Sequence, residues 1–234
     1  MKAVVVDKKE IALATLWVKF KVNEEFEFKP GQYMFINLIN PPYNDEKGTT
    51  RHFSIVNSPN EKGVLEMATR LRDSAFKKSL EAFPIGTEVE IQRIAGTFTL
   101  PEDTIKPLVF IAGGIGITPF VSMLRFINEE KLGYNITLLY SNRDLLSSVF
   151  LEELQELENS LTSFKLIATM TDDQSWHGEK RRINAQFIKE YLKDLGAYRF
   201  FVVGPPAMTE SVENALGELG VVEENLTKEN FTGY

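Results

Sequence analysis

The segment Gly113-Gly114-Ile115-Gly116-Ile117-Thr118-Pro119 contains the residue types that most directly suggest chemistry. It lies between an apolar run, Leu108–Ala112, and a stretch with helical spacing. Glycines at such a turn let backbone N–H groups approach a phosphate, and the start of the following helix favours the negative charge. The spacing differs from the G-x-G-x-x-G fingerprint, and a tight turn that needs positive φ is the structural alternative. We expect a phosphate-binding turn here.

Arg51-His52-Phe53-Ser54 is a second segment with chemical potential, and it follows the polar loop 40–50. Arg51 could pair with a phosphate through two hydrogen bonds, Phe53 could lie against a flat ring, and the Ser54 hydroxyl could donate to a ring nitrogen. Each residue also has an ordinary explanation, because a strand Phe is usually in the core and an edge Arg is usually solvated. The glycine-rich turn in the same chain favours the binding interpretation.

The composition excludes several other kinds of site. The 234 residues include no cysteine and only two histidines, His52 and His177, so we expect no disulfide, iron–sulfur cluster or transition-metal centre. A formal net charge of −7 argues against a general nucleic-acid binder. No apolar run is long enough for a signal peptide core or a membrane span, which predicts a soluble, cytoplasmic protein.

The pattern of the elements changes near residue 101. Residues 1–100 contain short strand signals separated by Pro/Gly turns and one helix at about Ser74–Ala82, which is typical of an antiparallel barrel. The predicted strands are Ala3–Val6, Leu16–Phe20, Tyr33–Ile39, Arg51–Ile55, Leu65–Arg70 and the alternating Glu88–Ile94.

From residue 101 onward, continuous apolar strands alternate with helices, which predicts a parallel sheet covered on both faces. The strands are Leu108–Ala112, Ile136–Ser141, Phe164–Met170 and Phe200–Val203. The helices are one from Pro119 to before Gly133, then Phe150–Leu161, Asn184–Leu195 and Pro206–Leu219.

These motifs, together with Gly204-Pro205-Pro206-Ala207-Met208, resemble the ferredoxin–NADP(H) reductase superfamily of flavin-dependent oxidoreductases. The resemblance covers nearly the whole chain. It implies a six-stranded antiparallel FAD-binding barrel in residues 1–100 and a Rossmann-like, parallel-sheet NAD(P)-binding domain in residues 101–234.

The resemblance also implies roles for the barrel residues. Arg51 would hold the FAD pyrophosphate, Phe53 would flank the isoalloxazine, and Ser54, the first catalytic candidate, would hydrogen-bond near flavin N5. Relatives usually carry Gly-x-x-Ser at the start of the barrel helix, where this chain has Ser74, Ala75, Phe76 and Lys77. The amides at the helix start and the Lys77 charge could bind phosphate in its place. His52 and Thr69 complete the residues expected around FAD.

In the second domain the resemblance assigns the nicotinamide end and pyrophosphate to the glycine turn, with the Gly-Pro-Pro segment as the opposing wall. The residues expected to bind the nucleotide are Gly113, Gly114, Gly116, Thr118, Pro119, Gly204, Pro205 and Met208. Val203 stands where many relatives have a cysteine. Ser141, Asn142 and Arg143 would contact the adenosine end; Arg143 favours NADPH, but the choice between NADH and NADPH stays open.

The C-terminal segment, Glu229 to Tyr234, is either a frayed tail or a functional cover. By the resemblance, Phe231 or Tyr234 would form a displaceable lid over the flavin. Glu229 would act near the ring as a proton-relay or electrostatic residue, the second catalytic candidate.

The expected function is hydride transfer between NAD(P)H and FAD, with electrons passed to or from a separate carrier such as ferredoxin or flavodoxin. Because the chain has no cysteine, no fused iron–sulfur domain is expected. Three alternatives stay open: a reductase of small acceptors such as free flavin, quinone or ferric chelates; a non-catalytic flavin- or nucleotide-binding module; and a nucleotide-binding chain whose barrel has lost flavin because Ser74 and Lys77 replace the usual phosphate contacts. We expect no nucleic-acid partner and no membrane insertion.

Overall fold

The computed structural model describes residues 1–231, which divide into two compact units. The first unit contains Met1–Leu100 and also Thr118–Phe126. The second contains Pro101–Ile117 and the chain from Ile127 onward. Part of one helix therefore belongs to the first unit although it follows the second unit's glycine turn in sequence.

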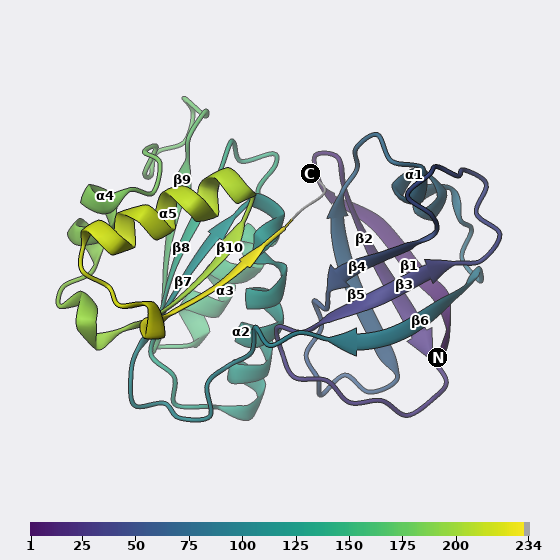
Figure 1. Ribbon diagram of the computed structural model, residues 1–234, viewed down its shortest axis with the longest axis horizontal. Coiled ribbons are helices and arrows are strands. Elements are labelled where there is room, and N and C mark those ends of the chain that lie inside the picture. The colour runs from purple at the N-terminus through teal and green to yellow at the C-terminus, as the bar shows by residue number, and fades with distance from the viewer. Residues whose placement is uncertain (232–234) are drawn as a thin grey trace. The chain divides into compact units, whose positions relative to one another are not determined.

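The first unit is built on a six-stranded antiparallel sheet with the order β4-β3-β6-β1-β2-β5 (Figure 1). Its end strands, β4 and β5, also contact each other, so the sheet curls into a barrel. The strands are β1 (Lys2–Ala12), β2 (Thr15–Val22), β3 (Tyr33–Leu38), β4 (Thr50–Ser54), β5 (Val64–Arg70) and β6 (Glu88–Ala95). Helix α1 (Ala75–Ala82) lies between β5 and β6 in the chain.

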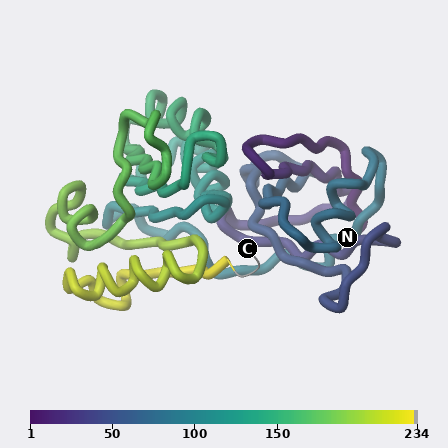
Figure 2. Tube along the Cα trace, turned by 90° about the horizontal axis from the view of Figure 1, so that it is seen from above, coloured from purple at the N-terminus to yellow at the C-terminus, as the bar shows by residue number. Residues whose placement is uncertain are grey.

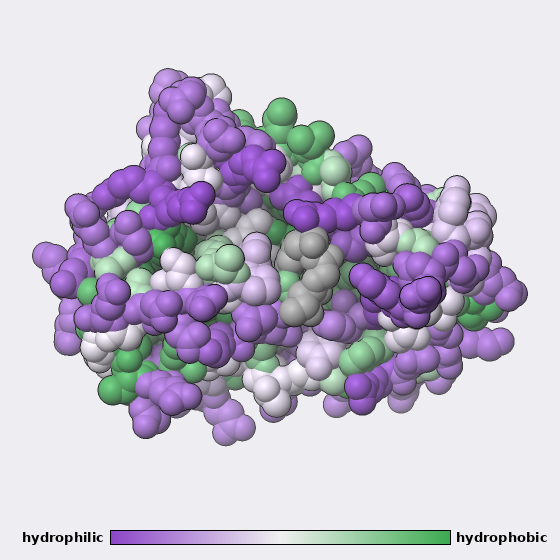
Figure 3. Space-filling view, turned by 45° about the horizontal axis from the view of Figure 1, so that its top comes forward, coloured by the Kyte–Doolittle hydropathy of each residue, from purple (hydrophilic) through white to green (hydrophobic). Residues whose placement is uncertain are grey.

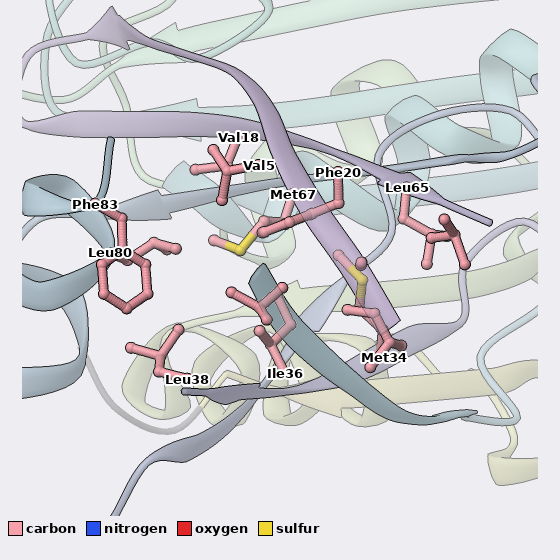
Figure 4. Close-up of a cluster of buried hydrophobic side chains, with 14 of the residues drawn as sticks. Val5, Val18, Phe20, Met34, Ile36, Leu38, Leu65, Met67, Leu80 and Phe83 are labelled. Carbon is pink, nitrogen blue, oxygen red and sulfur yellow. The ribbon is translucent and has the colours of Figure 1, made fainter. Parts of the chain in front are cut away.

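Alternation along the strands produces the barrel core. In β6, Val89 and Ile91 are fully buried while Glu88 and Glu90 are exposed, as the sequence pattern predicts. The buried side chains of the strands meet those of α1, including Leu80, in one cluster (Figure 4). This apolar cluster holds β4 and α1 in place.

The second unit is a five-stranded parallel sheet with the order β11-β10-β7-β8-β9. Helices cover both of its faces (Figure 1), and all six residues of β7 are buried. The strands are β7 (Leu108–Gly113), β8 (Ile136–Asn142), β9 (Phe164–Met170), β10 (Arg199–Gly204) and β11 (Leu226–Asn230). The α-helices that follow β7 in the chain are α2 (Thr118–Glu130), of which only the residues from Ile127 onward belong to this unit, α3 (Leu151–Ser160), α4 (Ala185–Tyr191) and α5 (Pro206–Glu218). Short 3₁₀ turns are η1 (Gly114–Ile117), η2 (Leu195–Ala197) and η3 (Glu223–Asn225). The predicted fold class, an antiparallel barrel followed by a parallel α/β sheet, is confirmed.

The structure differs from the sequence prediction in several details, and β1 (Lys2–Ala12) is longer than the predicted strand Ala3–Val6. Residues 226–230 form strand β11, parallel to β10 and beside α5 (Figure 2), so Glu229 lies in a sheet and not in a tail. Helix α2 ends at Glu130 because Lys131 adopts a left-handed conformation (φ 53°), two residues before the expected Gly133. Helix α4 ends at Tyr191 because Leu192 is extended, which shortens the predicted helix Asn184–Leu195.

The face of the molecule in Figure 3 is mainly hydrophilic. Figure 3 shows small, separate apolar areas among polar residues on one face, and the exposed large apolar side chains come from distant parts of the sequence. Within residues 1–231, no helix combines the length and the apolar character that a bilayer span requires.

Candidate functional site

Arg51 on β4 has an unused hydrogen-bond donor. Its Nη1 donates to the carbonyl oxygens of Lys47 (2.8 Å) and Thr50 (2.7 Å), which fixes the guanidinium against its own loop. Its Nη2 is buried and makes no hydrogen bond within the described residues, although Asp45 Oδ1 lies at an ion-pair distance of 3.5 Å. An orphaned, buried guanidinium nitrogen fits an additional anionic ligand.

Two further cations lie near Arg51, beside the start of α1. Burial, helped by the charges of Arg72 and Arg51, lowers the pKa of Lys77 to about 8 from its usual 10.5. The Ala75 amide at the helix start donates to Asp45 Oδ2 (3.3 Å). Arg51, Arg72 and Lys77 thus lie near one another, and Lys77 is part of the first turns of α1, beside the helix N-terminus. This donor set fits a diphosphate group.

The other predicted barrel residues divide into two sets. Phe53 lies on the same face of β4 as Arg51, and both pack against the Phe76 ring at 5.6 Å. Phe76 itself is buried in the barrel core, so it supports the cluster from behind. His52, on the opposite face, is exposed against the rings of Tyr33 and Phe35.

Three predicted barrel residues have other environments. Ser54 ends β4 and is 6% exposed. Ser74 is the N-cap residue of α1, but its side chain makes no capping hydrogen bond. Thr69 is buried on β5, where it pairs with Leu16 of β2. The structure therefore brings together Arg51, Phe53, Phe76 and Lys77, whereas His52 and Thr69 lie in other surroundings.

In the glycine turn, the backbone at Gly116 lies close to the backbone at the end of β10. Gly114 has φ +53°, a conformation that favours glycine, and its carbonyl accepts a hydrogen bond from the Tyr140 hydroxyl (3.2 Å). A Cβ on Gly116 would lie 2.7 Å from the Val203 carbonyl oxygen. Helix α2 begins directly after η1, with Thr118 buried and Pro119 in the first turn. Gly116 is thus required by packing, and the α2 N-terminus follows the turn without a linker.

The Gly-Pro-Pro segment lies beside this turn in the sheet. Strand β10 pairs with β7 up to Val203 opposite Ala112, and α5 follows from Pro206. Met208 packs into the space that a side chain at position 113 would fill, since a Cβ on Gly113 would lie 2.1 Å from the Met208 sulfur and 3.2 Å from Pro205. The two predicted nucleotide-binding segments are therefore neighbours.

The residues predicted to bind the adenosine end lie at the carboxyl end of β8, the strand next to β7. Ser141 is half-buried and Arg143 is exposed. Asn142 is 5% exposed, and neither its amide nitrogen nor its amide oxygen has a hydrogen-bond partner within the described residues. An unpaired buried amide is costly, so a polar ligand is a physical reason for Asn142 at this place.

Glu229 has an environment that suits proton chemistry. Burial raises the pKa of its carboxyl group to about 7 from 4.5, and Oε2 has no hydrogen-bond partner within residues 1–231. It lies opposite Val203 in the β10–β11 pair. The Phe231 amide donates to the Gly204 carbonyl (3.1 Å), which places the end of the described chain beside the Gly-Pro-Pro segment. Tyr234 lies outside the described residues.

Sequence reasoning missed Arg72, a member of the cation cluster, and Asp45, the carboxylate beside Arg51 and the Ala75 amide. Arg72 stands two residues before Ser74, so its place near a helix start was a usable signal. Asp45 gave none, because only the folding of loop 40–50 brings it to Ala75. No group of three metal-ligating side chains occurs among the described residues.

Comparison with known proteins identifies both halves of the chain. Residues 2–100 match the family model of the oxidoreductase FAD-binding domain, and residues 110–214 match that of the oxidoreductase NAD-binding domain. Among solved structures, the flavohem-like FAD/NAD binding domain of nitric oxide dioxygenase from Vibrio cholerae O1 biovar El Tor has the same fold, with a TM-score of 0.86, 18% identity and 98% of each chain covered.

Two curated relatives show the kind of protein that contains such a chain. The reductase component of propane 2-monooxygenase from Rhodococcus jostii (strain RHA1) is 25% identical, with 88% of this chain and 56% of the relative covered. Reductase component 1 of terephthalate 1,2-dioxygenase from a Comamonas species is 23% identical, with 94% of this chain and 64% of the relative covered. The chain thus spans less than two thirds of the length of these relatives.

The two domain matches follow one another in the order of the two folded units and together account for most of the sequence. FAD and a nicotinamide nucleotide are the cofactors of these domains, and the chemistry of such a pair is NAD(P)H-dependent flavoprotein oxidoreduction. The chain therefore consists of an oxidoreductase FAD-binding domain followed by an oxidoreductase NAD-binding domain.

Proposed function

We propose that this chain is the electron-entry module of a redox system: it accepts hydride from NAD(P)H on FAD and passes electrons to a separate carrier such as ferredoxin or flavodoxin. The observation that carries the flavin part is the cation cluster of Arg51, Arg72 and Lys77 at the α1 N-terminus, with its orphaned Arg51 Nη2. The names of the two curated relatives, both reductase components of oxygenases, support a role that serves a partner.

The proposal gives the chain's residues distinct tasks. Arg51, Lys77 and the α1 amides bind the FAD diphosphate, Phe53 lies along the ring, and Ser54 donates to it near N5. The glycine turn and the Gly204–Met208 segment bind and orient the nucleotide, with Ser141, Asn142 and Arg143 at its adenosine end. Glu229 holds or releases a proton near neutral pH. Bound flavin would supply the step from a two-electron donor to one-electron acceptors, and the protein would supply orientation.

An anaerobic titration tests the reductase half-reaction. The protein is loaded with FAD, and NADH or NADPH is added while the flavin absorbance is followed. The proposal expects bleaching by at least one nucleotide. If flavin binds and neither nucleotide bleaches it, the chain is a binding module.

Acceptor choice is tested next with the loaded protein. Cytochrome c serves as the final electron acceptor, with and without added ferredoxin or flavodoxin. The proposal expects fast cytochrome reduction only when a carrier protein is present. Equal turnover with free flavin or ferric chelates alone would support the small-acceptor reductase.

A further inference from the structure

Glu66 is an acidic side chain buried on the outside of the barrel. Its β5 neighbours Leu65 and Met67 point into the core, so alternation places Glu66 on the outer face, yet it is only 5% exposed. The residues that cover this face include the start of α2, since Thr118–Phe126 belongs to the same compact unit as the barrel.

The Glu66 carboxylate joins α2 to two barrel strands. It accepts hydrogen bonds from Arg125 Nη1 of α2 (3.2 Å) and, on β2, from Trp17 Nε1 (3.3 Å), and it pairs with Lys19 Nζ of β2 (2.9 Å). Arg125 Nη1 also lies 3.3 Å from the Val56 carbonyl oxygen. A buried carboxylate with two cationic partners fixes geometry more strongly than an exposed pair.

Other contacts hold the same helix on the barrel. The buried Ser122 hydroxyl donates to the Asn57 carbonyl (2.7 Å), and Asn57 Oδ1 accepts from the Glu66 amide (2.8 Å). The Phe120 ring packs against Phe98 at 5.6 Å. Met123 fills the space beside Gly31, where a Cβ would lie 2.4 Å from its methyl carbon. Helix α2 is therefore held on the barrel through Phe120, Ser122, Met123 and Arg125.

The position of α2 has a consequence for the glycine turn. Thr118, the first residue of α2, follows Gly114–Ile117 directly in the chain. An α-helix is a stiff element, so contacts at Ser122 and Arg125 restrain the amides at its N-terminus and the turn attached to it. Hydride transfer is sensitive to misplacement of the reacting groups by about 1 Å.

We propose that Glu66 and Arg125 are positioning residues for hydride transfer: they fix α2 on the FAD-binding unit and, through α2, the turn that receives NAD(P)H. This inference rests on the proposed function. The competing explanation is that the Glu66 cluster only stabilises the fold. The two explanations predict different effects for the two cationic partners of Glu66, because Lys19 belongs to the barrel whereas Arg125 belongs to α2. Positioning requires that Arg125 affect the hydride-transfer rate and that Lys19 affect only stability.

The experiment compares Arg125→Met with Lys19→Met, which removes the other cation from the same carboxylate. Arg125→Lys tests rescue by charge, and Ser122→Ala loosens the same helix without leaving a charge unpaired. Each FAD-loaded variant is measured for the FAD dissociation constant, the melting temperature, the long-wavelength charge-transfer absorbance on nucleotide addition, and the flavin-reduction rate constant at saturating nucleotide.

We expect Arg125→Met to lower the rate constant by about 10- to 100-fold and to weaken the charge-transfer band, with FAD affinity unchanged. Arg125→Lys should recover part of the rate, and Ser122→Ala should show a smaller loss. Lys19→Met should lower the melting temperature while keeping the wild-type rate and band. If Arg125→Met folds and keeps both, or if Arg125→Met and Lys19→Met lose both equally, the inference is wrong. If neither NADH nor NADPH reduces the flavin of the wild-type protein, the proposed function itself is wrong.

Discussion

At the scale of single residues, Lys77 links flavin binding to pH. Its pKa of about 8 means that much of the population is neutral above that pH. A bound diphosphate favours the charged ammonium form of Lys77. At pH 7 Lys77 already carries this proton before FAD binds, whereas at pH 9 most Lys77 side chains must take it up on binding. We expect FAD affinity to fall by up to about tenfold between pH 7 and pH 9. Calorimetric titrations at both pH values measure the change.

The neighbouring Lys78 provides the matched control for Lys77. Lys78 is more than half exposed and pairs with Asp73 at 2.7 Å, whereas Lys77 is half-buried near Arg51 and Arg72. Lys77→Met should weaken FAD binding and remove most of the pH dependence, and Lys78→Met should change neither. An unchanged pH dependence in Lys77→Met would show that another group takes up the proton.

Glu229 gives a residue-scale prediction for stability. Because its folded pKa, about 7, exceeds the usual 4.5, the carboxyl contributes stability below pH 4.5 that is lost as the pH rises through 7. Glu229→Gln stays neutral throughout. The melting temperature of the variant minus that of the wild type should therefore be larger at pH 8 than at pH 5. A difference that is constant from pH 5 to pH 8 would refute the raised pKa.

At the scale of elements, the glycines at the crossing of β7, η1 and β10 differ in what an added methyl group would meet. At Gly116 it would meet backbone, the Val203 carbonyl and Gly204 Cα, which cannot move without shifting β10. At Gly113 it would meet mainly the flexible Met208 side chain. Gly116→Ala should cost about 1–3 kcal/mol of stability and weaken nucleotide binding. Gly113→Ala should cost less and be relieved by adding Met208→Ala, as urea unfolding can measure.

Helices and strands with a strong local sequence pattern could be predicted, whereas strand β11, whose pattern is weak, could not. The apolar runs of β7 and β10, the alternation in β6 and the Pro-started helices α2 and α5 all have local patterns. Strand β11, by contrast, is Leu-Thr-Lys-Glu-Asn, an edge strand in which Thr227, Lys228 and Asn230 are exposed. Its parallel pairing with β10 depends on the sheet and leaves no local trace.

The candidate site follows the same division between local and long-range signals. Arg51 and the glycine turn could be picked out because each lies in a short motif. Their relation to Lys77, Arg72 and Asp45 depends on how loop 40–50 and α1 fold against β4. The contact between Glu66 and Arg125, 59 residues apart in sequence, is of the same kind.

At the scale of the whole molecule, the domain boundary expected from the sequence differs from the division into compact units, because the first unit also contains a later part of the chain. We propose a domain boundary near residue 101, where residues 101–107 lack helix or strand and Ile105 is 87% exposed. Nevertheless Thr118–Phe126, beyond that boundary, packs with residues 1–100. A chain cut in 101–107 should therefore yield fragments that stay together.

Limited proteolysis tests this expectation. A broad-specificity protease should cut first within 101–107, because the backbone there is exposed and outside the sheets. The two fragments should then co-elute in size-exclusion chromatography and separate only in denaturant, since Phe120, Ser122 and Arg125 remain bound to the barrel. Arg125→Met should weaken the association, and Lys19→Met should not, because Lys19 contributes nothing from the second fragment. Fragments that separate without denaturant would show that α2 adds little to the first unit.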